Sequence, residues 1–471
     1  MVKGTRRFAA GVTLALCAAV ARAQAQTTAA VRPLDYTRFV LGNGLVVLLN
    51  EDHSSPIVAV DVWYKLGAKN ELPSQTGFAH LCEHLMGEGS PNVSVPERVL
   101  ISSVGGRSTF WANTTEDITH FYYTLPRNAL ETALWMESDR MAAPLTRADS
   151  SHIRAVRETI RQERVQNRET PVFGLADPFT RAAMFAGGYA NDPLGRMSAI
   201  DAATADDVKQ FCAPYYLTNN AVLSLSGDFT TASAKTLIER YFGGIARGDD
   251  PPSAGQVDTS RLRGAARLVL EDRNAHVATL RFAWPSVGYS VPDRLPLVAL
   301  ASLLSRDRTG VLSKLLIEDR GLATRVVAKA FDFEKRGIFQ IEIIPRTDAS
   351  MTTIETLVDS VLSSFSAQSI RAAGLDAFKR MNAVQAMTSL QTRAARADTL
   401  AHGEIFAGDP AVYAKELAAT AALTTSDVAR VAKQYLGANR VVMSMVPAGR
   451  LDMVSKPELP YVLVSSPAGR M

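Results

Sequence analysis

The feature that most constrains this chain is a pair of histidines four residues apart, with a glutamate directly before the second. Residues 80–84 read His-Leu-Cys-Glu-His. On a helix, His80 and His84 lie one turn apart, so both imidazoles project from one face and suit two nitrogen ligands of one tetrahedral cation. Glu83 lies on the flank of that face, where its carboxylate can reach an attacking water without itself being a ligand. We therefore predict a helix here that carries a catalytic metal.

The rarity of the pattern favours a metal site over ordinary surface or core histidines. Only 7 of the 471 residues are histidine, yet two of them fall four apart with a glutamate between them. Leu81, Leu85 and Met86 give the same helix an apolar side to bury. The order His-x-x-Glu-His is the inverse of the commoner His-Glu-x-x-His of zinc proteases.

Length and composition indicate a globular chain with two or more domains. Of the 471 residues, 47% are hydrophobic and 21% are charged, and the formal charge of +4 is spread along the chain. No block of lysine and arginine and no basic stripe with interleaved aromatics occurs, so nucleic acid is not an expected partner. Beyond the N-terminal segment, no apolar run reaches the length of a stable membrane span.

The first 25 residues have the pattern of a cleavable signal peptide. Three basic residues precede an apolar run over residues 8–20, and small-x-small sites come after it that end at Ala23 and Ala25. A twin-arginine signal and a lipoprotein site at Cys17 are weaker alternatives to plain secretion. We expect the mature protein to be periplasmic or secreted.

The number of cysteines predicts no disulfide framework. Three cysteines occur, and Cys17 leaves with the signal peptide. Cys82 and Cys212 remain, which is no disulfide framework. We interpret Cys82 as a small buried hydrophobic residue rather than a reactive group.

The segments that flank the histidine motif alternate between strand-like and helix-like patterns. An Asn-Gly turn at 43–44 separates two β segments within residues 39–49. Further apolar, β-branched runs predict strands, and apolar residues at helical spacing predict helices. The expected strands are 57–64, 108–112, 119–125 and 221–225, and the expected helices lie around 96–104, 130–141, 153–165 and 205–211.

A polar stretch rich in proline and glycine at 246–262 is the clearest linker in the chain. The segment after this linker resembles a diverged second copy of the first half. Trp63 has a counterpart in Trp284, and Asp207-Val208 has one in Asp427-Val428. The second copy lacks the histidine motif. The expected organisation is a domain over 35–245, the linker, a second domain over 263–450, and a tail over 451–471.

A catalytic zinc normally takes three protein ligands and a water. The third ligand must therefore come from elsewhere in the chain. Spacing alone does not choose among the acidic candidates, which are Glu88, Glu116, Glu137, Glu158 and Glu163.

Residues 38–450 resemble the pitrilysin family (M16) of metallopeptidases with the inverted motif, which includes insulin-degrading enzyme and the mitochondrial processing peptidase. The likeness is greatest to the short bacterial members built from two domains. The resemblance implies an α+β fold with two homologous domains, each a mostly antiparallel sheet with helices on one face. It rests on Gly77-x-x-His80-x-x-Glu-His84, Gly105-Gly106, Glu137-x-Asp139-Arg-Met141, Glu163-Arg164, and Asn219-Asn220-Ala221 ahead of Gly227-Asp228.

The same resemblance implies Zn²⁺ as the cofactor and Glu163 as the third ligand. Glu163 lies 79 residues after His84 and is followed by Arg164 and a Pro-Val-Phe-Gly segment, as in the family. Glu158 is the fallback. Family members often carry a further glutamate where this chain has Val156, so the support that an outer carboxylate gives to the ligands is expected to be weaker.

Substrate in the family adds to an edge strand near Gly105-Gly106 through backbone hydrogen bonds. The corresponding substrate-binding residues here are Trp111, Ala112 and Asn113. Members commonly have Asn-Ala at the first two of these positions. Trp111 is therefore either part of an apolar subsite or a core aromatic.

The second half departs from active members, which carry an arginine and, seven residues later, a tyrosine that reach the substrate carbonyl. This chain has Ile317 and Thr324 at those positions. Arg320 and Arg325 lie close by but are interpreted as surface charges. Either the enzyme is impaired, or a partner chain supplies the pair. We favour a heterodimer with a second pitrilysin-family subunit, with a homodimer as the alternative.

The function that this resemblance implies is a zinc endopeptidase acting on peptides or unfolded segments, with Glu83 moving the proton between water and the leaving amine. A non-catalytic assembly or binding subunit that keeps the peptidase fold is the main alternative. A different metallohydrolase on the same site is a third hypothesis.

Overall fold

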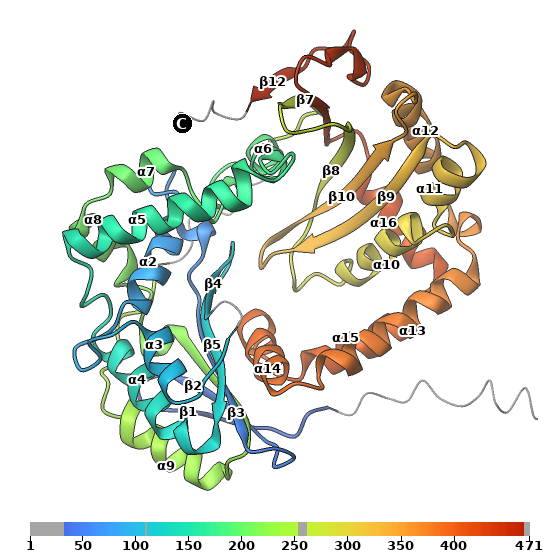
Figure 1. Cartoon of the computed structure of the whole chain (residues 1–471). Helices are drawn as coiled ribbons and strands as arrows, with labels where there is room; N and C mark the ends of the chain where they lie inside the picture. The colour runs from blue at the N-terminus through green and yellow to red at the C-terminus, as the bar shows by residue number, and fades with distance from the viewer. Residues whose placement is uncertain (1–32, 109–110, 253–260, 466–471) are drawn as a thin grey trace, which may run out of the picture.

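The computed structural model describes residues 33–108, 111–252 and 261–465, and in it each half of the chain builds one six-stranded sheet with helices (Figure 1). Sheet 1, from the N-terminal half, has the strand order β1-β2-β6-β3-β5-β4, and sheet 2 has the order β12-β7-β11-β8-β10-β9. The expected signal peptide at 1–25 lies outside the described residues.

The N-terminal half contributes six strands and eight α-helices among its described residues. Its strands are β1 (Thr37–Val40), β2 (Val46–Glu51), β3 (Ile57–Tyr64), β4 (Ala112–Thr114), β5 (Thr119–Pro126) and β6 (Ala221–Gly227). Its helices are α2 (Phe78–Gly87), α3 (Glu97–Ser103), α4 (Leu130–Ala142), α5 (Ser150–Arg164), α6 (Ala176–Met184), α7 (Met197–Ala202), α8 (Ala205–Cys212) and α9 (Thr231–Phe242).

The C-terminal half contains a similar set of strands and helices among its described residues. Its strands are β7 (Ala265–Asp272), β8 (Thr279–Val287), β9 (Ala323–Asp332), β10 (Arg336–Pro345), β11 (Arg440–Pro447) and β12 (Val462–Ser465). Its helices are α10 (Arg294–Ser305), α11 (Val311–Ser313), α12 (Met351–Ser363), α13 (Ala372–Ser389), α14 (Arg393–Ala407), α15 (Val412–Ala422) and α16 (Thr425–Tyr435).

The two sheets repeat one succession of strand pairings. In sheet 1, β2 and β6 are parallel, and β6–β3, β3–β5 and β5–β4 are antiparallel. In sheet 2, β7 and β11 are parallel, and β11–β8, β8–β10 and β10–β9 are antiparallel. The predicted α+β fold with two homologous domains is confirmed. The segment expected as a tail contains β12, which pairs with β7 at the edge of sheet 2.

One predicted strand differs in its bounds. We expected a strand over 108–112, but β4 covers only Ala112–Thr114. Trp111 adopts a φ of 66°, which interrupts an extended backbone. Residues 109–110 lie outside the described residues.

Strand β3 is buried on both faces, which is unusual for a strand of a mostly antiparallel sheet. Val58, Val60 and Val62 face the core beneath the helices of the N-terminal half. The alternate residues, among them Asp61 and Trp63, point to the opposite face. Something must therefore cover that second face.

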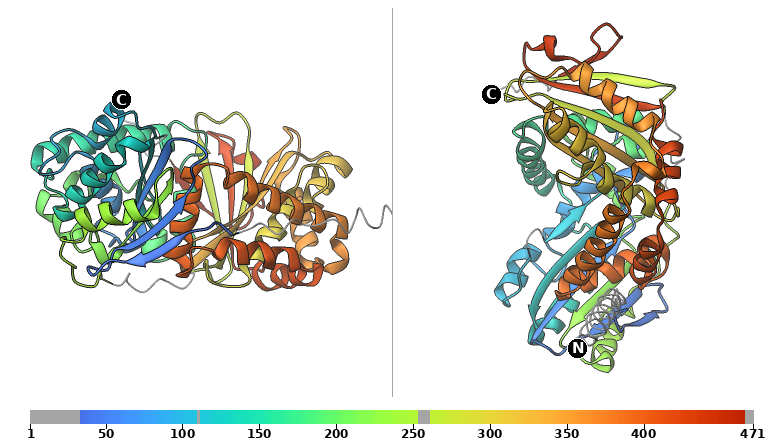
Figure 2. Two further views of the ribbon diagram at one scale, coloured as in Figure 1. Left: turned by 90° about the horizontal axis from the view of Figure 1, so that it is seen from below. Right: turned by 90° about the vertical axis from the view of Figure 1, so that its right-hand side faces the viewer.

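The cover is α14, a helix from the other half of the chain. Its Leu400 and Ala401 pack on Trp63 and Val222 of sheet 1. The reverse exchange also occurs, because Met184 of α6 packs with residues of sheet 2. The ribbon views show α14 beside sheet 1 and α6 beside sheet 2 (Figures 1 and 2). Each sheet is thus completed by a helix that the other half supplies.

Polar contacts fix α14 in place on sheet 1. The Arg38 guanidinium donates two hydrogen bonds, of 2.9 and 2.8 Å, to the Glu404 carboxylate. The Ser224 hydroxyl donates to the Ala397 carbonyl at 2.8 Å. Among the described residues, none of the helices combines the length and apolarity that crossing a bilayer requires.

Candidate metal centre

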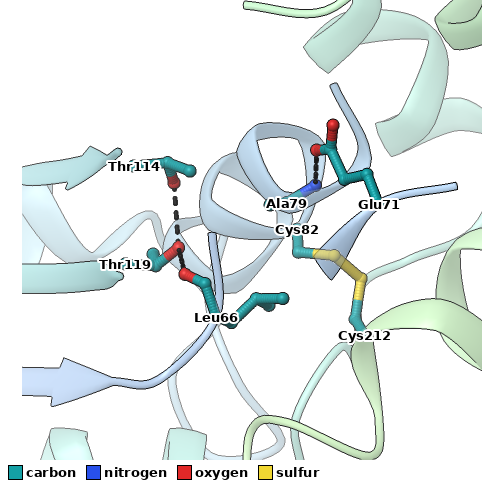
Figure 3. The surroundings of a disulfide bond; sticks show 7 residues. All are labelled: Leu66, Glu71, Ala79, Cys82, Thr114, Thr119 and Cys212. Atoms are coloured by element: carbon teal, nitrogen blue, oxygen red, sulfur yellow. Dashed lines mark hydrogen bonds between the residues drawn. A yellow bond between two sulfur atoms is a disulfide. The ribbon is translucent and has the colours of Figure 1, made fainter. Parts of the chain in front are cut away.

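Helix α2 begins at a position that only glycine suits. Gly77 has a φ of 92°, and a Cβ there would lie 2.8 Å from Ile200 Cδ1 and 2.9 Å from Gly195 Cα. The buried Glu71 carboxylate accepts hydrogen bonds from the backbone N–H groups of Gly77 and Ala79, each at 2.9 Å. Figure 3 shows the bond from Ala79. The first N–H groups of a helix have no partner within the helix, so these two hydrogen bonds from Gly77 and Ala79 stabilise the first turn.

The two sides of α2 have different roles. Leu81, Leu85 and Met86 are buried in the core against sheet 1, as the sequence pattern predicts. His80 and His84 project from the other side, with their Nε2 atoms 3.2 Å apart. The apolar side therefore determines where the two imidazoles point.

Helix α5 brings a carboxylate to the two imidazoles. The Asp149 side chain caps its N-terminus by accepting from Ser151 N and His152 N. At the other end of α5, Glu163 Oε2 lies 3.3 Å from Nε2 of both His80 and His84. Two imidazole nitrogens and one carboxylate oxygen thus form a nearly equilateral triangle.

The size of this triangle fits a zinc ion. In a tetrahedral site with metal–ligand distances of about 2.0–2.1 Å, neighbouring ligand atoms are roughly 3.3 Å apart. The three separations of 3.2, 3.3 and 3.3 Å match that value. The donor set, two neutral imidazoles and a carboxylate, is also one that catalytic zinc uses.

The pKa shifts of the three side chains follow from their burial and proximity. Burial lowers the pKa of His80, which favours the neutral imidazole that a metal requires. Burial is the largest influence on His84 and opposes its charge, but the hydrogen bond to Glu163 and the charges of nearby glutamates together raise the pKa of His84. Burial opposes the charge on Glu163 as well, yet the hydrogen bond to His84 and the charges of His84 and His80 together lower the pKa of Glu163.

The other acidic candidates from the sequence lie elsewhere. The exposed Glu158 accepts from Gln162 Nε2 at 2.8 Å. Glu116 pairs with Arg181 at 2.6 Å. Glu137 is buried and accepts from the Tyr123 hydroxyl at 2.9 Å. Glu88 comes after α2 and does not belong to the group of donors that converges with the two imidazoles. Val156 is buried in the core, so no carboxylate supports the ligands from that position.

Glu83 is held by a hydroxyl that sequence reasoning missed. The Thr114 hydroxyl on β4 donates to Glu83 Oε2 at 2.6 Å. Thr114 Oγ1 also lies 3.0 Å from Thr119 Oγ1 on β5, and the Thr119 hydroxyl donates to the Leu66 carbonyl at 2.9 Å (Figure 3). No sequence signal distinguishes Thr114 from an ordinary strand threonine, since the contact depends on how α2 docks on the sheet.

The segment proposed to bind substrate lies at the edge of sheet 1. Ala112 and Asn113 belong to β4, which pairs with β5 on one side only. The carbonyl of Trp111 accepts from Tyr122 N at 2.8 Å. The Trp111 side chain is half-buried and packs against the core of the N-terminal half. The other edge of β4 has no strand partner among the described residues.

At the positions where active family members carry arginine and tyrosine, this chain has residues that take part in the packing and backbone hydrogen bonding of the C-terminal half. Ile317 is packed against the core of the C-terminal half. The Thr324 hydroxyl donates to the Ile344 carbonyl at 3.2 Å. Arg320 and Arg325 are exposed. None of these four residues contacts the His80–His84–Glu163 group among the described interactions.

The interpretation of Cys82 as an unpaired buried residue was wrong. Cys82 forms a disulfide with Cys212 of α8, with the two Cα atoms 6.1 Å apart (Figure 3). Both residues are fully buried. The bond ties the histidine-bearing helix to a helix 130 residues further along the chain. The even number of cysteines left after signal removal was the only sequence signal for it.

Two family models match adjoining parts of the chain. The model described as Insulinase (Peptidase family M16) matches residues 46–196, and the model described as Peptidase M16 inactive domain matches residues 202–381. The chain belongs to peptidase family M16. The first model spans the His80–His84 motif and Glu163.

Related proteins and structures agree with this membership. The zinc protease PqqE of Helicobacter pylori is 26% identical over 308 residues, which cover 64% of this chain and 67% of that protein. The probable mitochondrial-processing peptidase subunit beta of Schizosaccharomyces pombe is 22% identical over 435 residues, covering 88% and 92%.

Solved structures show the same fold. A protease from Helicobacter pylori superposes with a TM-score of 0.80 at 21% identity, covering 88% of this chain and 100% of that one. The periplasmic protease PqqL from Escherichia coli gives a TM-score of 0.72 at 17% identity. That match covers 89% of this chain but only 48% of PqqL.

Proposed function

We propose that this M16 protein is a secreted or periplasmic zinc-dependent endopeptidase that hydrolyses peptide bonds of peptides or unfolded segments. The observation that carries the proposal is the triangle formed by His80, His84 and Glu163. Its dimensions match a tetrahedral zinc site, and relatives are named zinc proteases.

In this proposal the three ligands hold the ion, and Glu83 moves the proton. When bound, zinc supplies Lewis acidity that polarises the scissile carbonyl and makes water a nucleophile near neutral pH. The Glu83 carboxylate accepts the proton of the attacking water and delivers it to the leaving amine. Thr114 keeps one Glu83 oxygen in place, which leaves the other to face the water.

The substrate would bind in an extended form along β4. The unpaired edge of Ala112–Thr114 offers backbone donors and acceptors for β-strand addition. Such pairing recognises backbone rather than side chains, which suits unfolded segments. Trp111 would contact the first residue beyond the pairing.

A partner subunit would supply what the second half lacks. Ile317 and Thr324 serve the core and backbone of the C-terminal half, so no donor from these positions reaches the substrate carbonyl. The chain corresponds to about half of PqqL. We propose that a second M16 subunit carries the arginine and tyrosine, with self-association as the alternative.

The proposed compartment agrees with the cysteine chemistry. Structural disulfides persist in oxidising environments such as the periplasm and the extracellular space. The buried Cys82–Cys212 bond supports export of the chain, in keeping with the sequence of its first 25 residues.

A non-catalytic subunit that retains the fold is the second candidate. The loss of the arginine and tyrosine at Ile317 and Thr324 favours it. The conjunction of Glu83 with three converging ligands favours catalysis, because a binding subunit has no use for a proton acceptor beside a metal.

The substitution Glu83→Gln separates the two functions. We expect the variant to keep its zinc, because Glu83 is outside the ligand triangle, while peptide hydrolysis falls by about 10²–10⁴-fold through loss of the proton acceptor. Elemental analysis and cleavage of an unfolded protein measure the two effects. A variant that cleaves at the native rate would contradict the role of Glu83.

The matched control is His84→Ala, which should lose zinc and activity together. The partner is tested separately by purifying the chain alone and with any co-purifying M16 protein. Low activity alone and a large gain with the partner are expected. Full activity of the isolated chain would refute the partner requirement.

A further inference from the structure

A second group of metal-ligating side chains lies away from the proposed catalytic centre. It comprises Asp61 on β3, His120 on β5 and Asp398 on α14, and one donor atom from each lies within 4.8 Å of the others. His120 Nδ1 and Asp61 Oδ1 are 3.2 Å apart. The first two residues belong to the N-terminal half and the third to the C-terminal half.

This interdomain cluster is on the opposite face of sheet 1 from α2. His120 pairs with Trp63 and Asp61 with Tyr122 across β3 and β5, and these residues alternate with those that face the helical core. The side chain of Thr119, the residue before His120, points to the sheet face on which Glu83 lies. The cluster is therefore separated from the His80–His84–Glu163 triangle by the sheet itself.

Among the residues that the structure describes, the one charge partner of the two carboxylates is His120 of the same cluster. Asp61 is buried, and the one hydrogen bond of its side chain among the described residues is with His120. The Asp398 side chain makes no hydrogen bond or ion pair with any residue that the structure describes. Two carboxylates whose oxygen atoms lie this close repel each other. Asp398 is exposed to solvent.

The cluster is also preorganised. The rings of Trp63 and Tyr122 pack against the His120 ring. The centroid of each lies 4.6 Å from the centroid of His120. The Ser224 hydroxyl binds the carbonyl of Ala397, which fixes α14 one residue before Asp398. All three donors therefore sit on regular elements rather than on loops.

We propose that Asp61, His120 and Asp398 bind a second divalent transition-metal ion that links the two halves of the chain. One imidazole and two carboxylates make a mixed nitrogen and oxygen set, which suits Zn²⁺ or Mn²⁺ better than Ca²⁺ or Mg²⁺. The ion neutralises the two facing carboxylates. Because Asp398 is on α14, the bound ion fastens that helix to sheet 1.

The test removes the catalytic ligands first, so that its outcome does not depend on the proposed function. In the full mature chain carrying His80→Ala and His84→Ala, we expect one Zn²⁺ per chain by elemental analysis after equilibration with Zn²⁺ and dialysis. Adding Asp398→Asn should remove that ion. Asp398 is exposed and the substitution keeps its shape, so this variant keeps the fold, which circular dichroism verifies.

A second experiment measures how the ion is coordinated and whether it stabilises the contact between the two halves. Co²⁺ added to the His80→Ala, His84→Ala chain should give visible absorption typical of a nitrogen and oxygen site, and should raise the melting temperature by several degrees. Both effects should vanish with Asp398→Asn. Equal metal content and equal melting shifts with and without Asp398→Asn would overturn the second site, whatever the peptidase assay shows.

Discussion

At the scale of single residues, the proposed catalysis depends on how Glu83 is held as much as on its presence. Glu83 is buried and receives a 2.6 Å hydrogen bond from Thr114. Thr114 is in turn within 3.0 Å of Thr119, whose hydroxyl is anchored to the Leu66 carbonyl. The rotamer of Glu83 is thus fixed from the sheet rather than from its own helix.

Replacing Thr114 by valine should lower kcat while zinc binding stays intact. The substitution keeps the side-chain shape but removes a hydrogen bond to a charged group, which is worth about 1.5–3 kcal/mol or roughly a 10–100-fold change in rate. Steady-state kinetics on an unfolded protein substrate would measure kcat and KM separately.

Thr114→Ser is the matched control, because it restores the hydroxyl and should recover most of kcat. A merely structural role would affect both variants through stability and would not track the hydroxyl. If the valine variant were fully active, Thr114 would have no part in positioning Glu83.

At the scale of elements, α2 is held in three independent ways. Its apolar side packs into the core of the N-terminal half, Glu71 caps its first turn, and a disulfide ties Cys82 to α8. Cys82 lies between the two histidines, so the bond restrains the part of the helix that carries the imidazoles. A catalytic metal needs such fixed ligands, since small displacements alter its coordination.

Removing the disulfide with Cys82→Ala and Cys212→Ala should lower the free energy of unfolding by about 2–4 kcal/mol. The cross-link closes a long loop, and its loss gives the unfolded chain more freedom. Chemical denaturation followed by fluorescence measures the change.

A reductant provides the internal comparison for this prediction. Dithiothreitol should destabilise the native chain about as much as the double substitution does, and should leave the substituted chain unchanged. Equal stability of the native chain under oxidising and reducing conditions would mean that the disulfide contributes nothing.

At the scale of the whole molecule, the two halves are not independent packing units. Leu400 and Ala401 of α14 cover Trp63 and Val222 of sheet 1, and α6 packs on sheet 2 in return. Without the helix that the other half supplies, each half would expose an apolar face of its sheet. Large exposed apolar faces of this kind promote association.

We therefore expect a fragment of residues 33–252 produced alone to aggregate or to unfold at lower temperature than the whole chain. Co-expression with residues 261–465 should restore a soluble complex, because α14 then returns to sheet 1. Size-exclusion chromatography and thermal melting of the fragments, singly and together, measure this. A fragment 33–252 that is monomeric and as stable as the whole chain would contradict the interdependence of the halves.

Local patterns were sufficient for much of the fold and for part of the site. The four-residue spacing of His80 and His84 determines a shared helix face, because helical geometry acts within one turn. Apolar, β-branched runs located most strands of the N-terminal half, and the ordered echoes between the halves revealed the duplication. The bounds of β4 differed because the left-handed conformation of Trp111 has no signature in the sequence.

Tertiary structure alone decided the contacts between distant segments. Spacing left five acids as candidates for the third ligand, and Glu163 was predicted only through the family resemblance. The docking of α5 beside α2 is what brings Glu163 to the two imidazoles. The same holds for Thr114 on Glu83, for Cys212 on Cys82, and for Asp398 opposite Asp61. Local periodicity determines which face a side chain occupies, whereas the packing of whole elements determines which other face it meets.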